Sequence, residues 1–394
     1  MRVSLPGLVV FGVLLGGCAD AASTVRIDVV GDTTRVRIPD AGMEATGATV
    51  DILWRDDRLE RPTHVVQLGN RLVVADRARV HVVTVEGTHI ATEGRDGEGP
   101  TEFGYIGGLG RVGDAVVAVD VGNGRYVWLN DDGLVVSTRP RTRDPRYINP
   151  DLAEPAAFGS WGDGILERLD TNLGIDGMEG GMPTAVVWSS LADDSSAVVR
   201  RWDGVPWIQT SYFVGRASAY SARNLVAVGD SGWVAWTDGL EPCVLLLRVD
   251  RPGVVRSCRE RSRRAVTAEM RRVTPDLVDP ASDRADAVLE LARAQSMPEL
   301  VPSLDALRFG DDGRVWARVL GEDAPGIHPV LANEVGDDAF PPSRLWEAVD
   351  LEGRPAGRVR LPRAFAARLF TEDRVYGFLE LPSGELTLAQ AILP

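Results

Sequence analysis

The sequence lacks lysine altogether: all 43 of its basic residues are arginine. A phosphate-binding loop ending in Gly-Lys-Ser or Gly-Lys-Thr is therefore excluded, because it depends on that lysine. The Gly-x-Ser-x-Gly turn of serine hydrolases is also absent, and the nearest segment, 158–162, lacks its first spacing residue. The net charge of −14 argues against general affinity for nucleic acid or for anionic headgroups.

Histidine is scarce as well, and no pair has the spacing of zinc ligands on one helix face. The four histidines are His64, His81, His89 and His328. His81 and His89 fall on neighbouring predicted strands and are expected to be ordinary strand residues, because a catalytic metal needs about three converging ligands. The acidic turns 130–133 and 310–313 suggest calcium but do not continue into a calcium-binding loop. We expect hairpin turns there and no cofactor, with calcium or another divalent metal as the alternative.

Only three cysteines are present, and the first is the most informative. Cys18 follows Leu14-Leu15-Gly16-Gly17 at the end of an apolar run that begins after Arg2, which is the layout of an export signal. The Leu-Gly-Gly-Cys ending resembles the lipobox of bacterial lipoproteins, in which the cysteine is lipidated. The resemblance implies a signal peptide over 1–17, lipid attachment at Cys18, a short tether over 18–23, and a protein exported to the periplasm or cell surface.

The other two cysteines are predicted to form a disulfide. Cys243 and Cys258 flank two apolar runs joined by a turn near 250–253, so a hairpin brings them together. An exported protein meets an oxidising compartment, which favours a bond. The alternative is two buried free thiols.

A local pattern repeats six times along the chain: a two-residue turn signal followed by a short β-prone run. The runs begin at Arg71, Ala115, Ile165, Trp233, Arg314 and Arg374. Their shortest spacing matches one four-stranded propeller blade, and the order of buried strands followed by a polar outer strand is that of a blade. We predict an all-β protein, a six-bladed β-propeller over residues 24–394. The last repeat has no outer strand, so an N-terminal strand, 24–30 or 35–38, is expected to complete it.

Residues 262–300 differ from the rest and predict a helical insertion between blades four and five. Apolar residues from Ala285 to Ala292 recur at helical spacing, Asp283 is a candidate N-cap, and Pro298 ends the pattern. A shorter helical turn is expected over 267–273. The other long connections are 171–183, 203–222 and 321–343.

Residues 93–103, Glu-Gly-Arg-Asp-Gly-Glu-Gly-Pro-Thr-Glu-Phe, are Gly-rich and suit a crossover from one blade to the next, where Phe103 would wedge between blades. The segment resembles the crossover of bacterial six-bladed β-propeller lipoproteins related to NHL-repeat proteins, although Thr101 stands where that pattern usually has glycine. The resemblance implies fold and location but no chemistry, because that family is mostly uncharacterised.

Four aspartates each follow a strand start by five residues. They are Asp76, Asp120, Asp170 and Asp238. They could ring a funnel and bind a cation, but strand-end aspartates usually accept hydrogen bonds from local backbone, and we expect each to cap its own turn.

Two surface features are candidate contact sites. Seven arginines between 256 and 272 form a basic cluster, expected to be a solvated face. Aromatic residues in and next to the 203–222 connection are candidates for an exposed contact surface. They are Trp202, which directly precedes the connection, and Trp207, Tyr212 and Phe213 within it.

With no catalytic set evident, we predict an exported, membrane-anchored, non-enzymatic binding or interaction module. Its partner would be an envelope protein or a small polar ligand. We expect a monomer that touches the membrane through its lipid anchor only. The alternative is a propeller enzyme of lyase or lactonase type with a metal in the central funnel, a hypothesis that rests on the fold alone.

Overall fold

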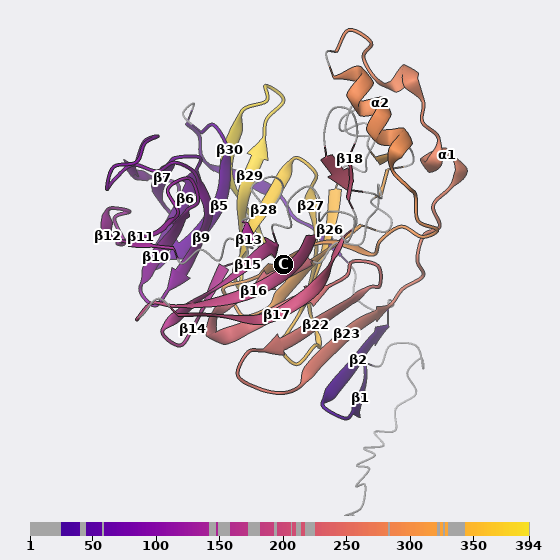
Figure 1. Ribbon diagram of the computed structural model, residues 1–394, viewed down its shortest axis with the longest axis horizontal. Coiled ribbons are helices and arrows are strands. Elements are labelled where there is room, and N and C mark those ends of the chain that lie inside the picture. The colour runs from indigo at the N-terminus through magenta and orange to yellow at the C-terminus, as the bar shows by residue number, and fades with distance from the viewer. Residues whose placement is uncertain are drawn as a thin grey trace, which may run out of the picture.

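The strands of the protein form six blades arranged as a propeller (Figure 1). The computed structural model describes residues 25–39, 45–56, 59–141, 147–148, 158–171, 182–192, 195–205, 207–209, 214–216, 225–282, 284–320, 324–325, 328–329 and 343–393. The predicted fold class is confirmed, with 56% of residues in strands and 7% in helices.

Each blade is built from strands that follow one another along the chain. Blade 1 contains β5 (Pro62–Leu68), β6 (Arg71–Asp76), β7 (Arg79–Thr84) and β8 (His89–Glu93). Blade 2 contains β9 (Ile106–Val112), β10 (Ala115–Asp120), β11 (Arg125–Leu129) and β12 (Val135–Pro140). Blade 3 contains β14 (Phe158–Trp161), β15 (Gly164–Thr171), β16 (Met182–Ser190) and β17 (Ser196–Val205), and β13 (Tyr147–Ile148) also pairs with β15.

Blade 4 contains β20 (Leu225–Val228), β21 (Trp233–Thr237), β22 (Cys243–Arg248) and β23 (Val254–Glu260). Blade 5 contains β24 (Leu304–Phe309), β25 (Val315–Val319), β26 (Ser343–Val349) and β27 (Pro355–Pro362). Blade 6 contains β28 (Phe365–Phe370), β29 (Arg374–Glu380) and β30 (Leu386–Ile392). A separate hairpin pairs β18 (Trp207–Gln209) with β19 (Val214–Arg216).

The six predicted turn-and-strand repeats are the second strands of the six blades, and their starts agree to within one residue. These strands are nearly continuous apolar runs because neighbouring blades cover both of their faces. In β6 and β10, for example, every residue after the first is buried. The fourth strands are more polar and more exposed, as in β8.

The N-terminal segment closes the ring, but by a route that differs from the prediction. Strand β4 (Val50–Trp54) pairs with β30 and completes blade 6. The expected closing strands, now β1 (Arg26–Val30) and β2 (Thr33–Pro39), instead extend blade 4, where β2 runs parallel to β23. A short strand, β3 (Thr46–Gly47), adds to blade 5. The segment thus covers the outer edges of three successive blades, which protects edges that would otherwise pair with other chains.

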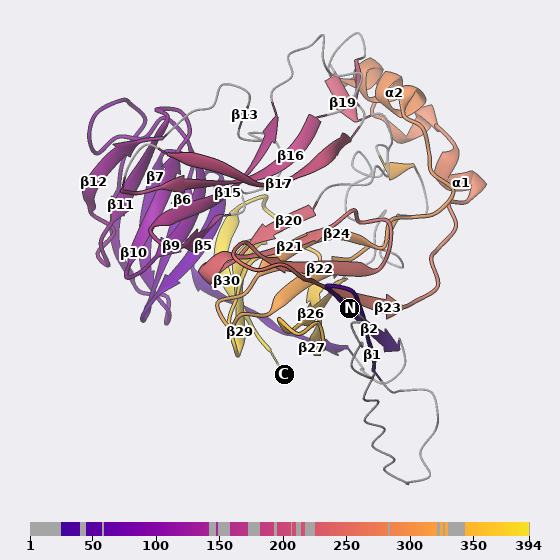
Figure 2. The same ribbon diagram turned by 60° about the horizontal axis from the view of Figure 1, so that its bottom comes forward.

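The helical insertion lies between blades 4 and 5, as predicted, and Figures 1 and 2 both place it outside the sheets. Helix α1 (Ala268–Arg271) begins at Thr267, whose side chain accepts a hydrogen bond from the Met270 N–H. Helix α2 (Ala285–Ala294) has Arg284 at its N-cap position, so the expected cap at Asp283 is wrong; Asp283 itself lies outside the described residues.

Phe103 is fully buried in an apolar cluster that joins blades 1 and 2, so the predicted wedge is confirmed. The preceding crossover is held by Glu102, whose carboxylate accepts hydrogen bonds from the Gly99 N–H at 2.8 Å and from Arg95 Nε at 2.7 Å. Gly94 has φ of +88°, and a Cβ there would lie 2.6 Å from the Phe103 ring. Glycine at that position therefore permits both the turn and the close approach of the ring.

The antiparallel order gives the propeller two distinct faces. The hairpin face carries the turns from first to second strands, including 69–70, 113–114, 230–232 and 310–313. The crossover face carries the connections between blades, including 94–105 and the helical insertion. Because β2 is parallel to β23, and β1 is antiparallel to β2, the chain enters β1 at the crossover face.

Candidate functional site

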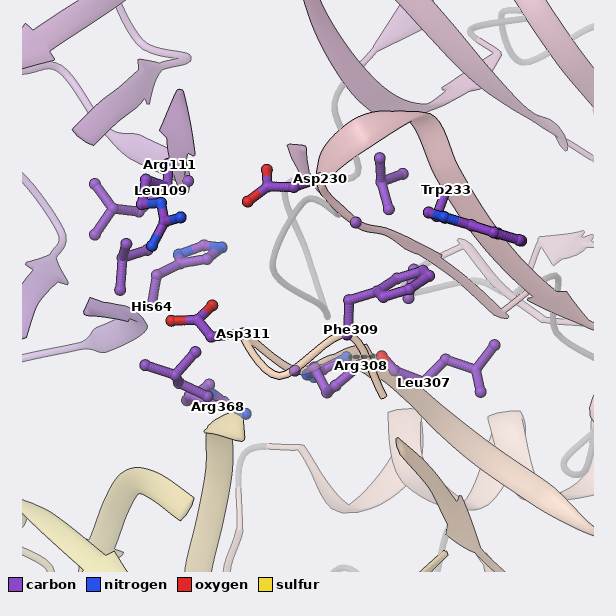
Figure 3. Close-up of a pocket in the computed structure, with 18 of the residues that line it drawn as sticks. His64, Leu109, Arg111, Asp230, Trp233, Leu307, Arg308, Phe309, Asp311 and Arg368 are labelled. Carbon is purple, nitrogen blue, oxygen red and sulfur yellow. Dashed lines mark hydrogen bonds between the residues drawn. The ribbon is translucent and has the colours of Figure 1, made fainter. Parts of the chain in front are cut away.

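A cavity of about 350 Å³ lies in the central channel, at the end where the innermost strands turn into the second strands (Figure 3). Its walls come from the innermost strands β5, β9, β20, β24 and β28, with Arg168 contributed by β15. This volume is at the lower end of the range of small-molecule sites in proteins.

Charged residues from five blades line this cavity. Its basic lining residues are Arg111, Arg168, Arg308 and Arg368, and its acidic ones are Asp230 and Asp311. Counted over the described residues, the lining is therefore positive by two charges at neutral pH, in a chain whose net charge is −14. Low-dielectric walls concentrate such a potential within a cleft, so the cavity attracts anions although the protein as a whole is acidic.

His64 is the most unusual group in the lining. His64 is only 8% exposed, and its Nδ1 lies 2.9 Å from Thr63 Oγ1. Among the described residues, its buried Nε2 has no hydrogen-bond partner. Burial, together with the charges of Arg368 and Arg308, lowers the pKa of His64 from 6.5 to about 3. The imidazole is therefore neutral at physiological pH, and its Nε2 is available to a bound molecule.

Asp311 faces the same cavity from the turn after β24. Its side chain reaches the water of the channel but is surrounded by protein atoms, and this partial desolvation raises the pKa of Asp311 to about 6. Arg111 opposes the rise, whereas Asp230 and Asp312 add to it. Asp230 accepts a hydrogen bond from Ser160 Oγ at 3.0 Å.

The rest of the lining is apolar. Phe309 and Trp233 present aromatic rings on the side of the cavity opposite His64 (Figure 3). Val226, Leu307 and further aliphatic residues line the wall. A site that combines charged groups with aromatic rings matches a molecule that has a polar head and a carbon body.

The described residues contain no group of three or more histidine, cysteine, aspartate or glutamate side chains that could hold a metal. Both acidic turns are hairpins, as predicted. Asn130 Oδ1 accepts hydrogen bonds from the Asp132 and Leu134 N–H groups, and Asp312 Oδ1 accepts one from the Arg314 N–H. His81 and His89 do approach each other, with ring centroids 6.4 Å apart, and both contact Thr92 Oγ1.

The strand-end aspartates accept backbone hydrogen bonds, but two of them do so at an unexpected place. Asp238 caps its own turn through the Leu240 and Glu241 N–H groups, as predicted. Asp120 also caps its own turn, through the Asn123 N–H group. In addition, Asp76 and Asp120 accept hydrogen bonds from the N–H groups of residues 60–61 and 104–105, which lead into the first strand of the same blade. Both aspartates therefore stabilise the crossovers between blades. The local sequence does not reveal this role. The side chain of Asp170 lies outside the described residues.

The basic cluster is only partly a solvated face. Arg259 and Arg261 have side chains 10% and 12% exposed and form ion pairs with Glu347 of blade 5, at 3.4 and 2.8 Å. Arg358 makes a third contact with the same carboxylate at 3.1 Å. Arg259 and Arg261 thus join the end of blade 4 to blade 5, because a buried carboxylate needs such partners.

The prediction that Trp202 belongs to an exposed contact surface is wrong. Trp202 is buried and stacks on Trp236, with ring centroids 5.8 Å apart. Trp207 lies in β18, but its side chain is outside the described part of the structure, as are Tyr212 and Phe213. The lipid attachment residue Cys18 and the signal segment 1–17 also lie outside it.

Cys243 and Cys258 face each other across β22 and β23, with Cα atoms 4.1 Å apart and their sulfur atoms bonded. In the part of the chain that is described, no helix has the length and apolar character needed to cross a membrane.

The sequence prediction missed the channel residues. Arg308 and Arg368 lie in the mostly apolar runs 304–309 and 365–370, one or two residues before a turn; Arg368 is the single charge of its run, whereas 304–309 also contains Asp305. The sequence did contain a signal for them: an arginine within an otherwise apolar strand needs a polar environment, so it indicates a channel or cavity beside that strand.

Fold and cavity together define a six-bladed β-propeller with a small-molecule-sized site in its channel. No family model and no curated protein matches this sequence. A candidate exported protein of Bacteroides fragilis is similar at 8% identity and a TM-score of 0.47, over 91% of this chain and 99% of that one.

Two further solved structures show a comparable likeness. A DUF4221 family member of Bacteroides vulgatus aligns at 8% identity and a TM-score of 0.46, over 89% of this chain and 96% of that one. An inactive virginiamycin B lyase of Staphylococcus aureus aligns at 7% and 0.40, over 88% and 100%. Likenesses of this strength say nothing about what the chain binds or catalyses.

Proposed function

We propose that this chain is an exported lipoprotein, anchored through Cys18, that binds a small ligand in its propeller channel. The observation that carries the proposal is the cavity with the unpaired Nε2 of His64 in its wall. A buried polar atom without a partner costs about 1–3 kcal/mol, and a bound molecule that supplies the partner removes that cost.

The path of the chain suggests how the site is presented. The tether enters β1 at the crossover face, and the cavity lies toward the hairpin face. An acyl anchor at Cys18 would hold the crossover face toward the membrane and leave the channel mouth facing the aqueous compartment, where small ligands diffuse freely.

Two measurements test the two parts of this proposal. Mass spectrometry of the membrane-extracted protein is expected to find acyl chains on Cys18, and Cys18→Ser is expected to release the protein from membranes. An unmodified amino terminus upstream of Cys18 would contradict the anchor.

Ligand binding is tested with methyl-labelled protein and a library of small metabolites. Ligands are expected to shift the methyl resonances of Val226, Leu307 and Leu369 in the cavity wall. The methyl groups of Val136 and Ile392, 59% exposed on outer surfaces, serve as the control and should not move. A library in which no compound shifts the cavity methyl groups would contradict the channel site.

A further inference from the structure

We infer that the channel cavity takes a small organic oxyanion, with its carboxylate or phosphate head beside Arg308, Arg368 and His64, and its carbon body against Phe309 and Trp233. The inference rests on the proposed channel site and specifies the ligand of that site.

Charge is the first argument. The described lining residues carry an excess of two positive charges, although the chain as a whole is strongly acidic. An excess of positive charge in the wall attracts anions. Guanidinium groups also match the geometry of a carboxylate or a phosphate.

His64 identifies where the head would lie. Arg308 and Arg368 line the same cavity as His64, and their charges help to lower the pKa of its imidazole. The imidazole is neutral, and Thr63 Oγ1 contacts its Nδ1 at 2.9 Å. When the hydroxyl donates to Nδ1, the proton of the ring is on Nε2, which then donates to an oxygen of the ligand. Without a ligand, that buried donor has no partner among the described residues.

The opposite wall argues for an organic anion over an inorganic one. Phe309 and Trp233 offer apolar ring surface that an inorganic ion cannot use (Figure 3). Burying an apolar body there removes nonpolar surface from water, which favours binding. The cavity of about 350 Å³ limits the ligand to one small molecule.

Isothermal titration of the purified full chain at pH 7.5 tests this with four probes: phenyl phosphate, benzoate, inorganic phosphate and benzyl alcohol. We expect phenyl phosphate and benzoate to bind, and benzyl alcohol and inorganic phosphate to bind about tenfold more weakly or worse, because each lacks one half of the match. Arg308→Gln and Arg368→Gln are expected to weaken phenyl phosphate about tenfold or more, while Arg308→Lys retains much of the affinity.

Arg251→Gln is the matched control, since it removes the same charge from an exposed turn outside the cavity. Circular dichroism and melting curves confirm that each variant is folded. The inference is overturned if no anion binds, if benzyl alcohol binds as tightly as phenyl phosphate, or if the cavity variants behave like the control. If library compounds still shift the cavity methyl groups in those cases, the proposed channel site is retained and only the anion inference is rejected. If no library compound shifts them, both the channel site and the anion inference are rejected.

Discussion

Asp120→Ala is the sharpest test of how this propeller holds its crossovers. The fully buried carboxylate accepts hydrogen bonds from the N–H groups of Gly104, Tyr105 and Asn123, from Asn123 Nδ2 at 2.8 Å, and from Arg125 Nε at 3.0 Å. The Arg125 side chain is only 15% exposed. Breaking a buried charge pair by removing one partner typically costs about 3–5 kcal/mol.

Arg125 keeps its contacts with the Gly99 and Glu102 carbonyl oxygens, so we expect the loss in free energy of unfolding to be near the lower end, about 3 kcal/mol. Asn123→Ala removes a smaller part of the network and should cost about 1–2 kcal/mol. Asp131→Ala, exposed in a turn of the same blade, should stay within about 0.5 kcal/mol of the wild type.

The assay is urea unfolding followed by tryptophan fluorescence, with the free energy extrapolated to water. A loss below about 1 kcal/mol for Asp120→Ala would refute the reasoning, because the carboxylate would then not be holding the crossover.

Four other outcomes are expected. Burial alone would raise the pKa of Asp76, but the nearby His81 ring, 3.6 Å away, and hydrogen bonds from the Glu60 and Arg61 N–H groups lower it below 3.8. The stability difference between wild type and Asp76→Asn should therefore be full at pH 5–8 and shrink as the pH falls below 3.8, and a difference that persists in acid would contradict this. Reduction of the Cys243–Cys258 bond should cost roughly 3 kcal/mol, and labelling of both thiols without reductant would show that no bond forms. Deletion of residues 26–39 should expose the edge of β23 and cause self-association on size-exclusion chromatography, whereas an unchanged monomer peak would show that this edge needs no cover. Protonation of Asp311, whose pKa is about 6, removes a negative charge from the cavity. Benzoate should therefore bind about three- to tenfold more tightly at pH 5.5 than at pH 7.5, and Asp311→Asn should abolish this difference.

The repeats were predictable because turn chemistry and burial act locally. A two-residue turn followed by a run that is buried on both faces marks the second strand of a blade wherever it occurs. All six such strands stand where the pattern places them, and Phe103 fills the predicted place between blades 1 and 2.

Features that depend on distant partners were not predictable in the same way. Nothing in the sequence of 26–39 says that it pairs with β23 rather than with the last blade, because either edge offers the same backbone groups. Asp76 and Asp120 have the expected kind of role, but their partners lie about 15 residues back along the chain. The unpaired nitrogen of His64 becomes visible only when its neighbours are known.

One diffraction experiment tests the central claim, that the channel is an anion site, most directly. Crystals soaked in 4-bromophenyl phosphate are expected to give a bromine anomalous peak beside Phe309 and Trp233, with phosphate density against Arg308 and Arg368. The claim would be contradicted if well-diffracting crystals soaked at high probe concentration gave no anomalous peak in the channel, or gave peaks on the outer surface alone.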